Sequence, residues 1–249
     1  MSFDLVVIGG TGDLAWRKLM PALFQAFRHG KLPEGGRILA VSRQEMTDDA
    51  YRAWLKERFL DVEGAKRPSD DEFARFAGLL HYLRLDLSQP AGYADLKAWL
   101  ASNVGRDTPA DVVVMYLATS PDLFTTVCAQ LGAAGLNGDR VRVVLEKPLG
   151  HDLASAREIN RVVRSVFREE QAFRIDHYLG KPAVPARYWP RTTSRATLSA
   201  VKGLSERSTF SFSSRIASAR LRDGGSMAII VNSCSAWFWI MSRSAPVRL

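Results

Sequence analysis

The feature that most constrains this chain is the regular alternation of short apolar runs with segments of helical periodicity. Apolar runs at about 3–9, 37–42, 81–87, 112–118 and 141–145 are typical of buried parallel strands. Helical spacing appears at about 13–29, 47–60, 70–80, 92–100, 121–134 and 153–167. The alternation predicts an α/β fold, a doubly wound parallel sheet covered by helices on both faces.

Two residues predict local detail within these segments. Pro21 lies inside the first helical segment, where it should kink the helix or mark a local break because it has no backbone N–H. Thr47 stands before the second helical segment and is a good N-cap residue.

The charge of the chain is unevenly distributed. The 249 residues are 47% hydrophobic, enough for one large domain or two small ones, and the net charge is +8. Residues 182–249 hold ten Lys or Arg and two Asp or Glu, which leaves 24 of each sign in residues 1–181. The basic excess therefore gives no reason to expect that the folded N-terminal part binds nucleic acid.

Composition also bears on the cellular setting. No apolar run reaches the roughly 18–20 residues of a membrane helix, and no basic region precedes the first apolar run. The two cysteines, Cys128 and Cys234, make neither a disulfide framework nor a metal site. We expect a cytoplasmic protein that contacts no membrane and holds no metal.

A glycine-rich turn follows the first apolar run. Gly10-Thr-Gly12-Asp-Leu-Ala15 fits the pattern G-x-G-x-x-A between a strand and a helix. Glycines let the backbone approach a pyrophosphate, and the free N–H groups of the helix start would bind it. Glycine turns join many strands to helices, so the motif is weak alone. The strands that follow it favour dinucleotide binding.

The end of the second apolar run distinguishes between cofactors. An Asp or Glu there would accept hydrogen bonds from the ribose hydroxyls of NAD, whereas this run ends in Ser42-Arg43. A guanidinium suits a 2′-phosphate, so Arg43 favours NADP. The alternative interpretation is that Arg43 is one of many surface arginines.

Two further segments carry groups suited to an anionic substrate. Glu146-Lys-Pro-Leu-Gly150 follows a strand, where ligands of open α/β sheets bind, and Arg174–Lys181 holds a carboxylate, an imidazole, a phenol and an ammonium. Each segment alone is better explained as an ordinary turn or as core packing. Together with Gly9-Gly-Thr-Gly-Asp-Leu14, they resemble the glucose-6-phosphate dehydrogenase family over residues 1–181.

The resemblance implies a fold and a reaction. Residues 1–175 would form a Rossmann-like NADP-binding domain, and residues 176–249 only the beginning of the family's second, α+β domain, followed by a Ser/Arg-rich tail unlike the family. The reaction would be the NADP-dependent oxidation of glucose 6-phosphate at C1 to 6-phosphogluconolactone, within the pentose phosphate pathway. A histidine would remove the hydroxyl proton while hydride passes to the nicotinamide.

The resemblance also assigns site residues. Glucose 6-phosphate would contact Lys147, His177, Tyr178 and Lys181, and Asp176 would orient the catalytic histidine. Lys147 would serve both ligands, and Pro148 would be cis as in the family. The residues expected to bind the cofactor are Gly9, Gly10, Thr11, Gly12, Asp13, Leu14, Arg43, Asp86, Leu87 and Lys147.

Other family features are missing. The histidines are His29, His81, His151 and His177, so the family's base in a Gln-Asn-His segment is absent, as is most of the sheet that forms its homodimer. We therefore expect impaired turnover, and the change of composition at Pro182 suggests a frameshifted or truncated product. The alternatives are a catalytically silent NADP-binding module and, less favoured, a binder of nucleic acid or acidic surfaces through the basic tail.

Overall fold

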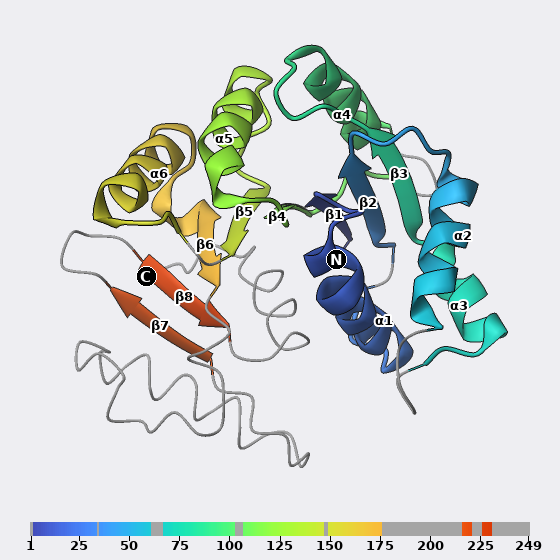
Figure 1. Ribbon diagram of the computed structural model, residues 1–249. Coiled ribbons are helices and arrows are strands. Elements are labelled where there is room, and N and C mark those ends of the chain that lie inside the picture. Colours follow the sequence, from blue (N-terminus) through green and yellow to red (C-terminus); the bar gives the residue numbers. More distant parts are fainter. Residues whose placement is uncertain are drawn as a thin grey trace.

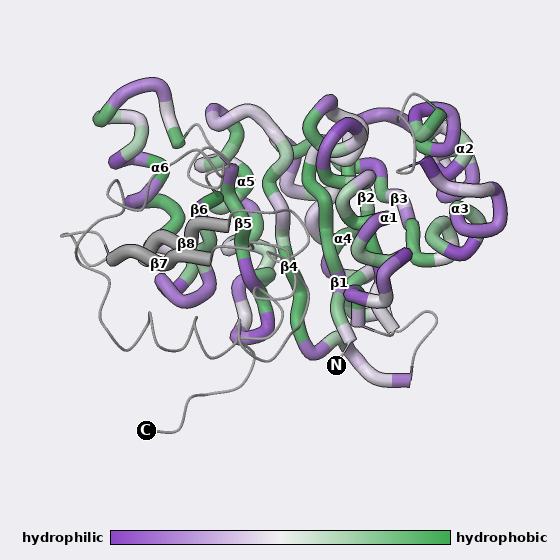
Figure 2. Tube along the Cα trace, turned by 90° about the horizontal axis from the view of Figure 1, so that it is seen from below, coloured by the Kyte–Doolittle hydropathy of each residue, from purple (hydrophilic) through white to green (hydrophobic). Residues whose placement is uncertain are grey.

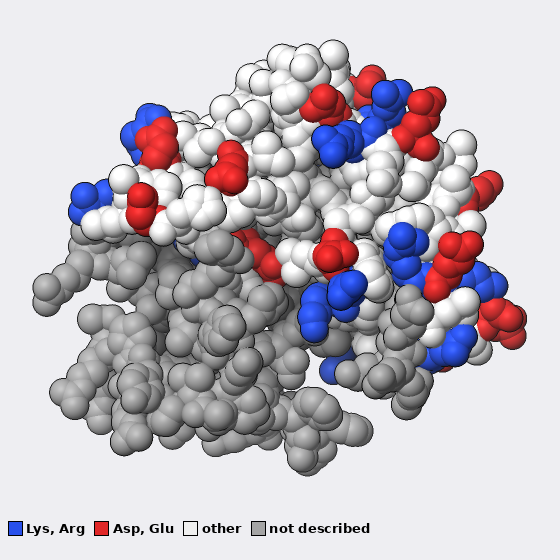
Figure 3. Space-filling view, in the orientation of Figure 1, with Lys and Arg blue, Asp and Glu red and all other residues white. Residues whose placement is uncertain are grey.

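The computed structural model describes residues 2–33, 35–60, 67–102, 107–146 and 149–175, together with the backbone of 216–220 and 226–230. Within these ranges no helix is long and apolar enough to cross a membrane. On the face shown in Figure 3, basic and acidic side chains lie intermixed over the described residues, in keeping with the balanced charge of that part of the chain.

A six-stranded sheet forms the centre of the protein (Figure 1). Its strands are β1 (Phe3–Ile8), β2 (Arg37–Ser42), β3 (Leu80–Arg84), β4 (Val112–Leu117), β5 (Val141–Glu146) and β6 (Ala172–Ile175). They pair in the order β3-β2-β1-β4-β5-β6, and every neighbouring pair is parallel. This is the strand order of dinucleotide-binding sheets.

Helices cover both faces of the sheet. One face packs against η1 (Ala15–Leu19), α1 (Met20–Arg28), α2 (Asp48–Phe59) and α3 (Asp70–Ala77), and the other against α4 (Ala91–Ala101), α5 (Phe124–Ala133) and α6 (Leu153–Val166). Along β1, Leu5 and Val7 join the first core, and Val6 and Ile8 the second. Because both faces are covered, the central strands β1 and β4 are buried along their whole length and are mostly hydrophobic (Figure 2). The predicted doubly wound α/β fold is confirmed.

Both local predictions are confirmed. The Thr47 hydroxyl accepts a hydrogen bond from the Ala50 amide at 3.1 Å and caps α2. The segment before Pro21 is a π-helix, η1, in which the Met20 amide bonds to the Ala15 carbonyl, and α1 begins only there. A proline that cannot donate a hydrogen bond therefore coincides with the local break.

Several predicted boundaries are wrong by a few residues. The helix predicted over 70–80 ends at Ala77, and the strand predicted over 81–87 is β3, which begins at Leu80 and ends at Arg84. Leu80 pairs with Ile38 of the sheet, so the apolar residue assigned to the helix belongs to the strand. The segment from Pro121 begins with the short 3₁₀ turn η3 (Pro121–Leu123) before α5.

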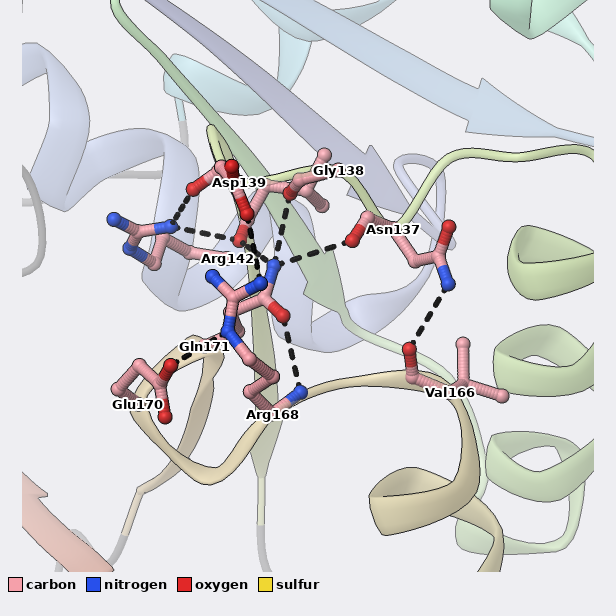
Figure 4. Close-up of polar contacts among 9 residues, drawn as sticks. Asn137, Gly138, Asp139, Arg142, Val166, Arg168, Glu170 and Gln171 are labelled. Atoms are coloured by element: carbon pink, nitrogen blue, oxygen red, sulfur yellow. Dashed lines mark hydrogen bonds and ion pairs between the residues drawn. The ribbon is translucent and has the colours of Figure 1, made fainter.

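The strand β6 was not predicted from the sequence. A short 3₁₀ turn, η4 (Glu169–Gln171), precedes this strand. The buried side chain of Gln171 joins this turn to the start of β5 (Figure 4). The Gln171 amide donates to the carbonyls of Gly138 at 2.9 Å and Val141 at 3.0 Å, and its oxygen accepts from the Arg168 amide. These bonds place β6 beside β5.

A buried ion pair joins β1 to β2 near their amino ends. Arg37 contacts Asp4 through two hydrogen bonds of 2.8 and 3.0 Å, and both side chains are almost fully buried. The guanidinium also lies over the Trp99 ring, 4.0 Å from its centroid. The paired geometry compensates the loss of hydration that burial imposes on both charges.

Two strands are described beyond residue 175. β7 (Ile216–Arg220) and β8 (Ser226–Ile230) pair antiparallel as a separate two-stranded sheet (Figure 1). The remainder of the segment 182–249, the Ser/Arg-rich tail, lies outside the described residues.

Candidate functional site

The candidate site lies at the carboxyl edge of the parallel sheet. The strand order reverses direction between β1 and β4, and such a switch point is where ligands of open α/β sheets bind. The glycine turn follows β1, Arg43 follows β2, Asp86 follows β3 and Thr119 follows β4. The fold therefore brings the predicted cofactor residues of three separate motifs to one edge.

The turn after β1 requires its glycines. Gly9 has φ +94°, and a Cβ there would lie 2.6 Å from the Ala118 carbonyl oxygen. A Cβ on Gly10 would lie 2.6 Å from the Cβ of Ala40. Larger residues would collide with β4 on one side and β2 on the other, so both glycines let the turn lie close against the sheet.

Backbone hydrogen bonds fix this turn and leave several amides available. The amides of Gly9 and Gly10 both donate to the Val41 carbonyl at 2.9 Å, and the Gly12 amide donates to Gly9. Within the described residues, no backbone acceptor pairs with the amides of Thr11, Asp13 and Leu14. Free amides at the start of a helix, on a turn without side-chain bulk, suit a pyrophosphate.

Tyr51 forms a hydrogen bond to the glycine turn from helix α2. Its hydroxyl, on α2, donates a 3.1 Å hydrogen bond to the Gly10 carbonyl, and its ring is fully buried. Burial raises the pKa of Tyr51, and the nearby Tyr82 contributes, so the phenol stays neutral and remains a donor. The bond orients the Gly10 peptide within the turn.

Tyr82 holds the loop that carries Arg43. Its hydroxyl lies 2.7 Å from the Ser42 hydroxyl and donates to the Gln44 carbonyl at 2.6 Å. Arg43 lies between these two anchored residues and is exposed. The guanidinium is therefore attached to a fixed piece of backbone at the edge of the sheet, next to the glycine turn.

Asp86 and Leu87 form the next turn along the edge. The Asp86 carboxylate accepts hydrogen bonds from the hydroxyl and amide of Ser88, which lower its pKa, and nearby Arg43 contributes to the same shift. The Leu87 carbonyl accepts a 3.0 Å bond from Tyr93. The Leu85 amide donates to the Ser42 carbonyl at 2.8 Å, so the turns after β2 and β3 begin beside each other.

The far side of the edge is formed by β5 and β6. Glu146 and Ile175, the last residues of these strands, are paired in the sheet, and Glu146 accepts a 2.5 Å hydrogen bond from Tyr116. Burial, together with the neighbouring Glu146, keeps the pKa of Tyr116 well above its usual value. The predicted residues Lys147, Pro148, Asp176, His177, Tyr178 and Lys181 lie outside the described residues.

Three residues of this edge were not found from sequence. Tyr51 and Tyr82 look like ordinary core aromatics within a helix and a strand, and Thr119 is an unremarkable residue after an apolar run. Their contacts join segments that are far apart in the chain, and no periodicity encodes such contacts.

The fold and the glycine turn define a nicotinamide-dinucleotide-binding α/β domain. A family model described as "Glucose-6-phosphate dehydrogenase, NAD binding domain" matches residues 6–185. The chain belongs to this family, as its motifs suggested.

Individual relatives agree with this assignment. Glucose-6-phosphate 1-dehydrogenase of Mycolicibacterium smegmatis is 44% identical over 181 residues, 73% of this chain and 36% of that protein. The enzyme of Rhizobium meliloti is 40% identical over 182 residues, with the same coverage. The chain thus spans about a third of the length of the curated relatives it matches.

Solved structures agree as well. A glucose-6-phosphate dehydrogenase in complex with its substrate glucose 6-phosphate superposes with a TM-score of 0.63 at 31% identity, covering 72% of this chain and 37% of that one. Glucose-6-phosphate 1-dehydrogenase from Mycobacterium avium gives 0.62 at 32% identity, covering 80% and 42%. These likenesses agree with the family assignment and with the fold described above.

Proposed function

We propose that this chain binds NADP at the carboxyl edge of its sheet. The observation that carries the proposal is the glycine turn after β1, whose free amides lie next to the anchored Arg43 loop. The amides would receive the pyrophosphate, and Arg43 the 2′-phosphate of the adenosine. A carboxylate at the end of β2 would repel that phosphate, and Ser42-Arg43 presents none.

The proposed reaction is that of the family, the oxidation of glucose 6-phosphate at C1 to 6-phosphogluconolactone in the cytoplasm. Bound NADP supplies a hydride acceptor at the nicotinamide. Lys147, His177, Tyr178 and Lys181 would hold the sugar phosphate, and Asp176 would orient a histidine base; the family's homodimer belongs to the same proposal. None of the three described histidines, His29, His81 and His151, is assigned as that base.

The second candidate is a module that binds NADP and does not turn over. It is favoured by the same observation, because the ligand roles proposed for described residues all concern the cofactor, whereas the residues expected to bind the sugar phosphate lie outside the described residues. The two candidates differ in whether glucose 6-phosphate reduces the bound cofactor.

The test is a titration of the full chain with NADP and with NAD, followed by addition of glucose 6-phosphate while the absorbance of reduced cofactor is monitored. Binding of NADP with sugar-dependent reduction supports the dehydrogenase. Binding without any effect of the sugar supports the silent module. Failure to bind either dinucleotide would overturn the proposal.

A further inference from the structure

Thr119 follows β4 directly across the switch point from the glycine turn. Its neighbour Ala118 donates its amide to the Ile8 carbonyl at 2.8 Å, which aligns the end of β4 with the end of β1. The Thr119 methyl group would lie 3.0 Å from a Cβ placed on Gly9. The Thr119 side chain therefore lies beside the glycine turn, at the point where the strand order reverses.

The hydroxyl of Thr119 is the unusual part of this residue. Its oxygen is buried and has no hydrogen-bond partner in the described structure. The adjacent Ser120 hydroxyl, by contrast, donates to Asp122 at 3.1 Å. A buried hydroxyl without a partner is unfavourable, and in native proteins such a group usually meets a ligand or a water molecule.

The position of Thr119 indicates which part of a ligand it would meet. Arg43 and Asp86 lie after β2 and β3, on the side of the switch point proposed for the adenosine. β4 lies on the other side of the turn that would receive the pyrophosphate. A dinucleotide that crosses the switch point would thus bring its nicotinamide half, rich in ribose hydroxyls and phosphate oxygens, to Thr119.

We propose that the Thr119 hydroxyl hydrogen-bonds the nicotinamide half of the bound dinucleotide, an inference that rests on the proposed function. Because that half is common to both cofactors, Thr119 contributes to affinity without distinguishing NADP from NAD. Arg43 has the opposite character, since it acts only on the 2′-phosphate.

The test is Thr119→Val in the full chain, which replaces the hydroxyl by a methyl group of similar size. We expect NADP and NAD to bind about five- to ten-fold more weakly, as for the loss of one hydrogen bond. Adenosine 2′,5′-bisphosphate, which lacks the nicotinamide half, should bind unchanged. The melting temperature of the unliganded variant should equal or exceed that of the wild type, because a buried unpaired hydroxyl has been removed.

Ser120→Ala is the matched control, because it removes a neighbouring hydroxyl that already has a partner, and it should leave dinucleotide affinity unchanged. Unaltered NADP affinity in Thr119→Val would overturn the assignment. An equal loss for the bisphosphate, or a lower melting temperature without ligand, would show a structural role instead. The proposed function is judged separately, from the wild-type chain. If the wild type binds the bisphosphate and NADP, NADP binding is supported whatever Thr119→Val does. One that binds neither defeats the proposed function and this assignment together.

Discussion

The phenol of Tyr51 donates a hydrogen bond of 3.1 Å to the carbonyl of Gly10, joining the first turn of α2 to the turn after β1. The same ring stacks on Tyr82, with centroids 5.3 Å apart. Two neighbouring aromatics thus anchor the two backbone segments proposed for the cofactor, Tyr51 the turn for the pyrophosphate and Tyr82 the loop for the 2′-phosphate.

Tyr51→Phe should weaken both cofactors equally. The variant leaves the buried Gly10 carbonyl without its partner, which should lower the free energy of unfolding by about 1 kcal/mol. The change also loosens the turn proposed for the pyrophosphate, a group that both dinucleotides contain. Urea denaturation and parallel titrations with NADP and NAD would measure both effects; a loss confined to NADP would contradict this role.

Tyr82→Phe should act selectively. It removes the bonds to Ser42 and Gln44 on either side of Arg43, so the guanidinium loses its fixed attachment. We expect NADP affinity to fall several-fold while NAD affinity changes little. Tyr51→Phe is the comparison, because the two variants delete the same atom from stacked rings; identical cofactor profiles would refute the division of roles.

Arg43→Ala should weaken NADP far more than NAD. The exposed guanidinium is assigned to the 2′-phosphate, a charge-assisted contact whose loss costs about 1.5–3 kcal/mol. The expected loss of NADP affinity is therefore roughly ten-fold or more. Isothermal titration with both cofactors is the measurement, and equal losses for the two would remove the 2′-phosphate assignment.

Arg37→Leu should destabilise the fold strongly. The change removes the guanidinium that faces the buried Asp4 carboxylate, at an expected cost of about 3–5 kcal/mol in unfolding free energy. Arg161→Leu is the control, since Arg161 also forms a two-bond pair, with Glu158, but on the exposed surface of α6. The control should unfold near the wild-type urea midpoint. Similar midpoints for both variants would mean that burial of the pair does not matter.

Glu72 should make the fold sensitive to acid. Two hydrogen bonds lower the pKa of Glu72 from 4.5 to about 2: the larger effect comes from the Arg28 side chain, the smaller from the Ser69 amide. A carboxyl whose pKa is lowered by folding stabilises the protein fully above its unfolded pKa. That contribution is lost as the pH falls from about 4.5 towards 2.

Melting temperatures of the wild type and Glu72→Gln, measured from pH 7 to pH 2.5, test this expectation. The variant should melt lower at pH 7 and decline less steeply in acid. Asp71→Asn is the control, because Asp71 directly precedes Glu72 and has no ion pair among the described contacts. This variant should keep the wild-type acid profile. A parallel decline in Glu72→Gln and the wild type would contradict the assignment.

Much of the fold could be predicted because its strands are buried on both faces. Val112–Leu117 contains only apolar residues and tyrosine, and such a run has few alternatives to a central strand. Ala172–Ile175 was missed because it is short and contains Arg174. That arginine is buried and donates to Asn160 and Glu169, partners that the sequence does not reveal as neighbours.

The candidate site likewise contains residues that the sequence predicts and residues that it does not. Gly10 and Gly12 could be found because their spacing follows from the geometry of a tight turn. Tyr51, Tyr82 and Thr119 could not, because their contribution depends on which strand lies beside which. The order β3-β2-β1-β4 brings them to one edge, and a local pattern does not contain that order.

All six strands of the parallel sheet lie within Phe3–Ile175, and this has a consequence for folding during biosynthesis. Its last strand is β6, which Gln171 joins to the start of β5. Domains generally fold as units, N-terminal first, while the ribosome is still at work. The nucleotide-binding half therefore has all its strands once Ile175 has left the exit tunnel. Its assembly need not wait for translation of the polypeptide that follows.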